Sequence, residues 1–423
     1  MAGIVRATWS ARREALRKDE HVTDQVHLAI ALERAGWHPA AWREASARAG
    51  DLTSPAYWRD LLRTADDAGI ALATIEDALS LTDRFESVDA LRRDRVRGRL
   101  DAVLIASFAA PLTRRIGLVP TVTTAHPEPF HVATGIQTLD FASRGRAGVR
   151  LVAGASAAER ANFGRRTSGV DAIPVSGRVE DAPEIVAAFR EAGEFADVLS
   201  RLWDSWQDDA IIRDAATGRF VDADRVHNIE FEGEFFSVTG ASIVPRSPQG
   251  RPLLTVLAHQ TVPYRLAAEH ADLVYVTPHD DSGLAGIRSE LEAAADELRT
   301  GGEPLRVYAD LLVLVEDTGA AARSAAERLD EWDGSPLASD ARIIVGTPGD
   351  VADAVRELAD AGVDGVRLRP ARQPADVVAI AEKVIPLLRS TRTLREDDGR
   401  GTLRARLDLA RPESRYVREK VAL

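Results

Sequence analysis

Eight short apolar runs, spaced along the chain, constrain the fold of this protein more than any other feature of its sequence. They are rich in branched residues and are typical of strands buried on both faces of a parallel sheet. The runs are residues 26–33, 69–76, 115–123, 147–154, 252–259, 271–277, 305–316 and 363–370. Segments with helical periodicity lie between most of them, among them 54–69, 129–143, 262–271, 317–332 and 347–362.

Repeated strand-then-helix units predict an α/β fold with a parallel sheet. Eight strands with intervening helices fit a (β/α)₈ or TIM barrel, and the chain of 423 residues falls in its usual size range. We assign a ninth apolar run, residues 341–347, to a loop because a barrel has eight strand positions. Ser54 is expected to cap a helix whose first residue is Pro55.

The regular alternation fails between about residues 155 and 250. A helix is expected near 183–206, and the polar, turn-rich segment after it is too long for an ordinary loop of a barrel. Such insertions usually lie over the C-terminal face, where sites are built. The charged residues from about 390 to 423 form either an ordered or a frayed tail. We therefore expect one barrel domain over residues 1–423, with an insertion after strand 4 and a C-terminal extension.

The composition excludes several classes of protein. A net charge of −12 disfavours nucleic acid and anionic membranes as partners. The absence of cysteine excludes disulfides and thiolate chemistry, and without an HExxH motif no metal site is predicted. The sequence also has no GxSxG, Walker A or strand-linked GxGxxG motif. Residues 1–20 lack the apolar core of a signal peptide and no run is long enough to span a membrane, so we expect a cytoplasmic protein.

Polar and aromatic residues gather where the predicted strands end, and in a barrel these positions face the site. Strand 1 leads into Trp37 and His38, strand 2 into Glu76-Asp77, and strand 3 into residues 123–131. Strands 5 and 6 lead into residues 258–261 and 277–280. Five of the nine histidines fall in this set, which favours a genuine site. Since protein nucleophiles are few, the reactivity is expected to come from a cofactor.

Structural explanations compete with this interpretation. At the strand ends, His126 and His131 could serve as helix caps. The pair Glu76-Asp77 could interact favourably with a helix dipole. Elsewhere the structural explanation is preferred: core packing for Trp203 and Trp206, and surface turns for Arg246 and Arg251.

Residues 201–254 resemble the long insertion of the bacterial luciferase-like flavin monooxygenases. The match is to the branch that contains the nitrilotriacetate, EDTA and dibenzothiophene-sulfone monooxygenases. The fragments that carry it are WDSW-DDA, RVH-I---G--F-V-G and PRSPQGRP. GWHPAAW, IEDAL, TLDFAS-GRAG and the closing RP--RY are similar to the same branch, so that the resemblance covers roughly residues 24 to 417.

The resemblance implies a (β/α)₈ barrel that works as one component of a two-component monooxygenase. Such enzymes receive reduced FMN (FMNH2) from a separate NAD(P)H-dependent flavin reductase, and with O2 they oxidise a small organic substrate through a C4a-peroxyflavin. The family also implies a homodimer or homotetramer.

Carried onto this chain, the resemblance implies a set of site residues. The flavin ring would contact Asp77, Thr123, Glu128 and Phe130, and the FMN phosphate would bind at Ala258, His259, Gln260 and Thr261. The candidates for hydrogen-bonding the peroxide or polarising the substrate are His38, His126 and His131. The candidates for substrate binding are Trp37 and Arg150.

Two departures from the family pattern leave other functions open. Family members often read Gly-Trp-Asn in strand 4, where this chain has Val149-Arg150. Their phosphate turn usually reads Gly-Ala-Ser, whereas this chain has Ala258-His259-Gln260. A protonated His259, or Thr261, would then replace the serine as phosphate ligand. The alternatives are an F420-dependent oxidoreductase on the same barrel and a non-catalytic flavin-binding relative.

Overall fold

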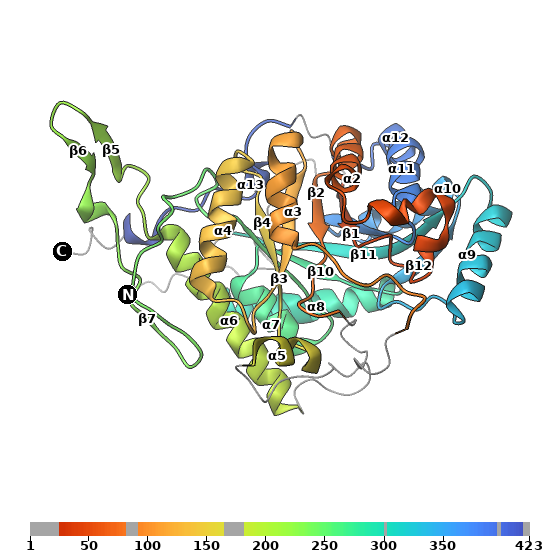
Figure 1. The fold of residues 1–423 in the computed structure, drawn as a ribbon, viewed down its shortest axis with the longest axis horizontal. Coiled ribbons are helices and arrows are strands. Elements are labelled where there is room, and N and C mark those ends of the chain that lie inside the picture. Colours follow the sequence, from red (N-terminus) through yellow and green to blue (C-terminus); the bar gives the residue numbers. More distant parts are fainter. Residues whose placement is uncertain (1–24, 82–91, 165–181, 300–302, 396–398, 418–423) are drawn as a thin grey trace, which may run out of the picture. The chain divides into compact units, whose positions relative to one another are not determined.

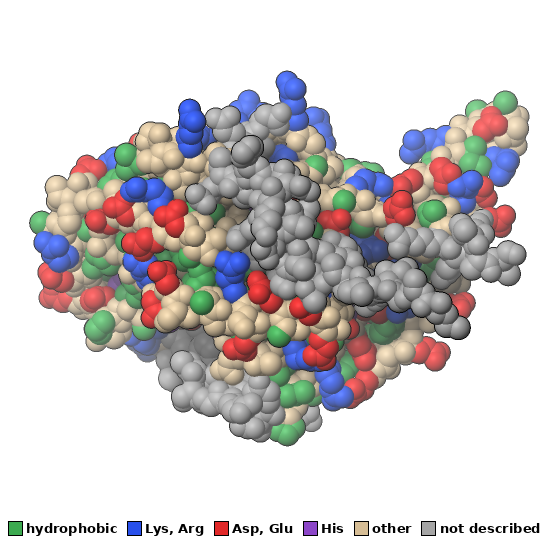
Figure 2. Space-filling model, turned by 180° about the vertical axis from the view of Figure 1, so that it is seen from behind, with side chains coloured by type: hydrophobic (Ala, Val, Ile, Leu, Met, Phe, Trp, Pro, Cys, Tyr) green, Lys and Arg blue, Asp and Glu red, His purple; other side chains and the backbone are tan. Residues whose placement is uncertain are grey.

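The computed structural model describes residues 25–81, 92–164, 182–299, 303–395 and 399–417 (Figure 1). The segment 1–20, for which the sequence predicts no signal peptide, lies outside these residues. Within the described ranges, no helix is long and apolar enough to cross a membrane. Figure 2 shows acidic and basic side chains interspersed over the described part of one face, so neither sign dominates there.

Eight strands form the barrel, and all eight were predicted from the apolar runs. They are β1 (His27–Leu32), β2 (Leu72–Ile75), β3 (Gly117–Thr123), β4 (Gly148–Val152), β9 (Leu253–Leu257), β10 (Leu273–Val276), β11 (Arg306–Val315) and β13 (Gly365–Pro370). The sheet order is β10-β9-β4-β3-β2-β1-β13-β11, and it closes because β10 also pairs with β11. The prediction of a (β/α)₈ barrel is confirmed.

The run at 341–347 is a strand, and its assignment to a loop was wrong. β12 (Arg342–Gly346) pairs in parallel with residues 311–315 of β11. β11 is ten residues long, and β10 pairs only with its first part, residues 306–309. The second part of β11 therefore extends beyond β10 with backbone groups that need partners, and a ninth strand joins there without taking a barrel position.

The helices outside the insertion include all five that were predicted there from helical periodicity. They are α2 (Pro55–Ala68), α3 (Ala102–Ala109), α4 (Pro129–Ala142), α7 (Thr261–His270), α8 (Asp281–Leu298), α9 (Gly319–Asp333), α10 (Pro348–Asp360), α11 (Ala375–Ala379) and α12 (Ile385–Ser390). Ser54 caps α2 by accepting the N–H of Ala56, with Pro55 as the first helical residue, as predicted. The helix ends at Gly69, whose φ of +82° is readily adopted by glycine.

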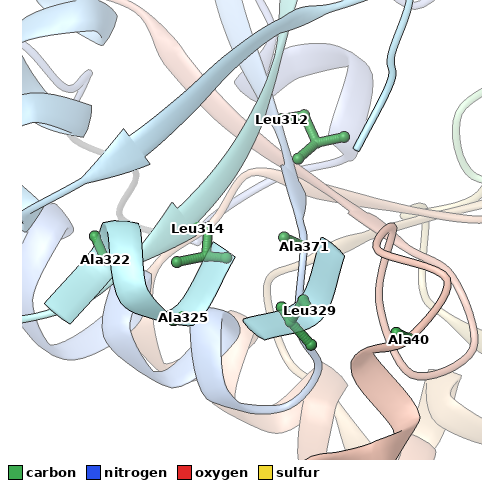
Figure 3. Close-up of a cluster of buried hydrophobic side chains, with 7 residues drawn as sticks. All are labelled: Ala40, Leu312, Leu314, Ala322, Ala325, Leu329 and Ala371. Atoms are coloured by element: carbon green, nitrogen blue, oxygen red, sulfur yellow. The ribbon is translucent and has the colours of Figure 1, made fainter. Parts of the chain in front are cut away.

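The chain divides into two compact units. Unit 1 comprises residues 1–73, 92–96 and 255–397, and unit 2 comprises residues 74–91, 97–254 and 398–423. In unit 1, Leu312 and Leu314 lie on one face of β11 because they are two residues apart. A stripe of α9 packs against them, and Figure 3 shows this buried cluster: Ala40, Leu312, Leu314, Ala322, Ala325, Leu329 and Ala371.

In unit 2, the insertion between β4 and β9 has its own helices and hairpins. They are α5 (Ala157–Phe163), α6 (Pro183–Asp204), β5 (Ile211–Asp214), β6 (Arg219–Val221), β7 (Phe231–Glu232) and β8 (Ser237–Val238). The helix predicted near 183–206 is α6, which packs on α4. Trp203 is buried and donates its indole N–H to the carbonyl oxygen of Ala133 at 3.2 Å, which confirms its predicted role in core packing.

The buried carboxylate of Asp204 joins the insertion to the C-terminal tail. It forms ion pairs with Arg246, Arg251 and Arg415. The side chain of Arg246 is only 1% exposed, so the prediction of surface-turn residues was wrong for this arginine. The structure therefore makes Arg246 and Arg251 counter-ions of a buried acid.

The described part of the tail, residues 399–417, is ordered within unit 2. Its helix α13 (Leu403–Arg406) begins where the N–H of Arg404 donates to Gln249 Oε1 at 3.0 Å. Arg411 pairs with Asp208 and donates to the carbonyl oxygen of Pro248 at 3.0 Å. For residues 399–417, these contacts support the ordered tail among the two possibilities that the sequence left open.

Candidate functional site

The predicted site residues belong to both units. Those of unit 1 are Trp37, His38 and the turn 258–261. Those of unit 2 are Asp77, Thr123, His126, Glu128, Phe130, His131 and Arg150. Most follow the C-terminal end of a strand, whereas Arg150 lies within β4 and Phe130 and His131 lie in the first turn of α4.

In unit 2, Arg150 is held by a buried ion pair. Thr121 lies opposite Arg150 in the pairing of β3 with β4, and its hydroxyl accepts a hydrogen bond from Arg150 Nε at 3.1 Å. The guanidinium also pairs with Glu76, and Thr74 donates to this carboxylate at 3.3 Å. The guanidinium is thus fixed by Glu76, which follows β2, and by Thr121 of β3. Glu76, which follows β2 directly, was noted at this strand end but was not among the residues predicted to bind flavin or substrate.

Asp77 links the end of β2 to the start of α3. Its carboxylate oxygens accept the N–H groups of Ala78 at 2.7 Å and of Ala102, the first residue of α3, at 2.8 Å. This contact agrees with the helix-dipole interaction considered for the pair Glu76-Asp77. Burial raises the pKa of Asp77 to about 6, although the two N–H bonds act in the opposite direction. A carboxyl group with such a pKa exchanges a proton close to neutral pH.

Thr123 and Glu128 mark the path from β3 to α4. Thr123 is the last residue of β3, and its hydroxyl donates to the carbonyl oxygen of Gly154 at 2.9 Å. Glu128 is the N-cap residue of α4 and is exposed, and Phe130 is half-buried in the first turn. These residues therefore follow β3 as predicted, and their contact with a flavin stays a prediction.

His126 and His131 have different surroundings. The ring of His126 stacks on Phe163 of α5, with 4.4 Å between the ring centroids and an interplanar angle of 4°. His131 is exposed on α4. The N-cap position of α4 belongs to Glu128 rather than to either histidine, so the helix-capping explanation does not account for them.

In unit 1, both ring nitrogens of His38 are engaged within the fold. Nδ1 accepts the N–H of Ala40 at 3.1 Å, so the neutral ring carries its proton on Nε2. Nε2 lies 3.1 Å from Asp330 Oδ1 on α9. The buried imidazole thus joins the loop after β1 to α9, a structural contact that the sequence did not indicate. Its catalytic role stays a prediction.

A buried network of charged side chains, which the sequence did not predict, contacts Trp37. Asp310 of β11 accepts hydrogen bonds from Arg367 Nε and Arg369 Nε of β13, both at 2.8 Å. The Arg369 guanidinium lies 4.7 Å from the centroid of the Trp37 ring, a cation–π contact. Arg369 also donates to Asp340 at 2.6 Å. The signal in the sequence was present, because Arg367 and Arg369 are two residues apart and so share one face of an otherwise apolar strand.

Asp340 connects this network to His259, one of the predicted phosphate ligands. His259 Nε2 lies 3.3 Å from Asp340 Oδ2, and Nδ1 lies 2.9 Å from the hydroxyl of Thr277 at the end of β10. Partial desolvation of the ring lowers its pKa, and this outweighs the opposite effect of Asp340. The imidazole is therefore neutral at pH 7, and the protonated histidine expected to attract a phosphate is not the favoured form.

The start of α7 is compatible with a phosphate through its backbone. The N-cap residue Gln260 makes no side-chain hydrogen bond to this first turn in the described part of the chain. The turn can offer the N–H groups of Thr261 and Val262, since Pro263 has none. The hydroxyl of Thr261 donates instead to Glu290 at 3.0 Å. The residues present thus fit an anion at the helix start, with two backbone donors and no formal positive charge from His259.

Comparison with known proteins decides the family. A family model described as luciferase-like monooxygenase matches residues 34–365. The chain belongs to this family. This luciferase-like monooxygenase is 25% identical to N-acetyl-S-(2-succino)cysteine monooxygenase of Bacillus subtilis, over 93% of the chain and 99% of that relative. It is 30% identical to nitrilotriacetate monooxygenase component A of Aminobacter aminovorans, over 71% of the chain and 64% of that relative.

A solved structure supports the fold of this luciferase-like monooxygenase. EDTA monooxygenase from Chelativorans sp. BNC1 superposes with a TM-score of 0.76 at 21% identity, covering 92% of this chain and 99% of that one. The branch inferred from the fragments of residues 201–254 is therefore confirmed, and the protein is a monooxygenase of the luciferase-like family.

Proposed function

We propose that this monooxygenase is the oxygenating component of a two-component system. Reduced FMN would come from a separate NAD(P)H-dependent flavin reductase, and the substrate would be a small organic molecule oxidised at a C–S, C–N or C–H position. One atom of O2 enters the substrate, and the other leaves as water with the two electrons of the reduced flavin. A relative named as component A of its monooxygenase supports the division of labour.

The proposal that the protein binds FMN rests on the start of α7. Its two backbone N–H groups and the positive end of the helix dipole suit the FMN phosphate. The flavin ring would contact Asp77, Thr123, Glu128 and Phe130, which follow β2 and β3. When bound, reduced flavin supplies the electrons that activate O2, and the protein residues orient the substrate and exclude water.

An anaerobic fluorescence titration tests the proposal. We expect binding of reduced FMN at micromolar or lower concentration and weaker binding of oxidised FMN. A separate aerobic assay with reduced FMN should show consumption of O2 coupled to product formation. Tight binding of F420 alone would favour the hydride-transfer alternative. If no flavin binds, the changes at Val149-Arg150 and Ala258-His259-Gln260 have removed the cofactor, and the proposal fails.

Pro263 provides a gain-of-function test of the phosphate site. The change Pro263→Ala adds a third N–H group to the first turn of α7 and is expected to tighten binding of reduced FMN about fivefold, or about 1 kcal/mol. Reduced riboflavin, which lacks the phosphate, is the matched control and should bind this variant as it binds the wild type. An equal gain for both ligands, or none for FMN, would place the phosphate elsewhere.

The three candidate histidines are tested by alanine substitution. We expect a change at any of His38, His126 and His131 to lower product formation without unfolding the barrel, by about 10²–10⁴ for a residue that transfers a proton. His38→Ala should also lower the melting temperature, because it removes contacts to Ala40 and Asp330. Product yield per reduced FMN is the measurement. Full turnover in all three variants would show the assignment to be wrong.

A further inference from the structure

Helix α5, a seven-residue helix of the insertion, is tied near both of its ends to the loop that follows β2. Its first turn contains a capping box, in which one carboxylate oxygen of Glu159 accepts the N–H of Ser156 at 2.7 Å. The other oxygen of this buried carboxylate accepts the N–H of Leu79 at 2.9 Å. Near the end of the helix, Asn162 donates to the carbonyl oxygen of Leu79 at 2.8 Å. Both backbone groups of one loop residue thus fix the orientation of α5.

These anchors determine the position of Phe163, the last residue of α5. The helix ends after it at Gly164, which has a φ of +63° and donates its N–H to the carbonyl oxygen of Arg160 at 2.9 Å. The side chain of Arg160 in turn donates to the carbonyl oxygen of Ala155, just before α5, at 2.9 Å. Phe163 itself is 40% exposed, so its ring is not packed as a core residue.

Phe163 instead stacks in parallel on the ring of His126, with 4.4 Å between the centroids and 4° between the planes. His126 lies in the loop between Thr123, the last residue of β3, and Glu128, the N-cap of α4. A partner on the face of an imidazole fixes the plane of the ring without using either nitrogen, because the hydrogen-bonding directions of both nitrogens lie in that plane. The stack therefore restricts the directions in which His126 can donate or accept a hydrogen bond.

We propose that Phe163 is a positioning residue for His126, which it holds so that a ring nitrogen is directed at the place where O2 is reduced. The inference rests on the proposed function, in which His126 is a candidate for this contact. The other two candidates differ, since His38 uses both ring nitrogens within the fold and His131 is exposed on α4. An aromatic side chain is needed at position 163, because leucine would fill a similar volume without a flat face to hold the imidazole plane.

Nuclear magnetic resonance of protein isotope-labelled at histidine Cε1 tests the stack without flavin or substrate. A parallel aromatic ring shields the protons of the ring that it covers, so we expect the His126 signal upfield of its ordinary position; His126→Ala identifies this signal by its loss. Phe163→Leu should return it toward the ordinary position, and Phe163→Tyr should keep it shifted. Phe141→Leu is the matched control, because Phe141 is a similarly exposed phenylalanine on α4, and it should leave the signal unchanged. A signal that Phe163→Leu leaves in place overturns the proposal.

A double-mutant cycle tests whether Phe163 acts through His126. The complex with reduced FMN is mixed with O2 without organic substrate, and the release of H2O2 is followed as O2 takes two electrons and two protons from reduced FMN. Because a hydrogen bond from His126 would hold the reduced oxygen in the site, we expect His126→Ala and Phe163→Leu each to release H2O2 about five- to tenfold faster. The double variant should be no faster than His126→Ala, and Phe163→Tyr should be close to the wild type.

The outcomes separate this inference from the proposed function. A further acceleration by Phe163→Leu in the His126→Ala background, or a loss of reduced-FMN binding in Phe163→Leu, overturns the positioning role and leaves the proposed function in place. Unchanged H2O2 release in His126→Ala overturns the role of His126 and with it the inference. Absence of reduced-FMN binding in the wild type overturns both.

Discussion

Replacing Asp204 by asparagine is expected to lower the free energy of unfolding by about 3–5 kcal/mol. Arg246, Arg251 and Arg415 all pair with this one carboxylate, which is fully buried. Asparagine keeps the shape but removes the negative charge, and it leaves the buried Arg246 guanidinium without its main counter-ion. The midpoints of thermal and urea unfolding, relative to those of the wild type, measure the loss.

Asp208→Asn is the matched control for Asp204→Asn. Asp208 also pairs with arginines, Arg411 and Arg246, but its side chain is 55% exposed. Ion pairs of exposed groups contribute little, so we expect a loss below about 1 kcal/mol. Similar losses in the two variants would contradict the role of burial, and with it the role of Asp204 as the junction between the insertion and the tail.

The second large effect is expected at Asp310. Its carboxylate is the shared partner of Arg367 and Arg369, and all three side chains are almost completely buried. Asp310→Asn leaves two neighbouring buried guanidinium groups with reduced compensation, at a cost of about 3–5 kcal/mol. Because Arg369 also contacts Trp37, a predicted substrate-binding residue, we expect weaker substrate binding as well as a lower unfolding midpoint.

Two further variants make the Asp310 prediction specific. Asp340→Asn removes another partner of Arg369, but its side chain is 42% exposed, so the loss should stay below about 1 kcal/mol. The triple variant Asp310→Leu, Arg367→Met, Arg369→Met removes all three charges at once and should be more stable than Asp310→Asn. If the triple variant is the less stable one, packing rather than charge compensation explains the effect.

The fragments that indicated the family have a structural role in this protein. In WDSW and PRSPQGRP, Trp203 packs on α4, and Asp204 binds Arg246 and Arg251. These residues are constrained by a buried ion network, which explains why such fragments can identify a family without taking part in its chemistry. The chemistry was predicted at other positions, the strand ends.

The sequence by itself determined the eight barrel strands, the helices α2, α4, α6, α7, α9 and α10, and the strand ends where site residues were predicted. These features depend on local patterns, namely branched apolar runs, helical periodicity and the capping of α2 by Ser54. The ninth strand, β12, required the tertiary structure, because it exists only where β11 extends beyond β10.

The partners of charged residues were also decided by the tertiary structure alone. Asp310 lies 57 residues from Arg367, and Asp204 lies 211 residues from Arg415. Such pairs form when the fold brings distant segments together and removes water from between them, and no local pattern encodes which segments become neighbours. For the same reason, the sequence showed a histidine at position 259 but not the protonation state of its ring. Partial desolvation of its ring, which outweighs the opposite effect of Asp340, favours a neutral group rather than a cation.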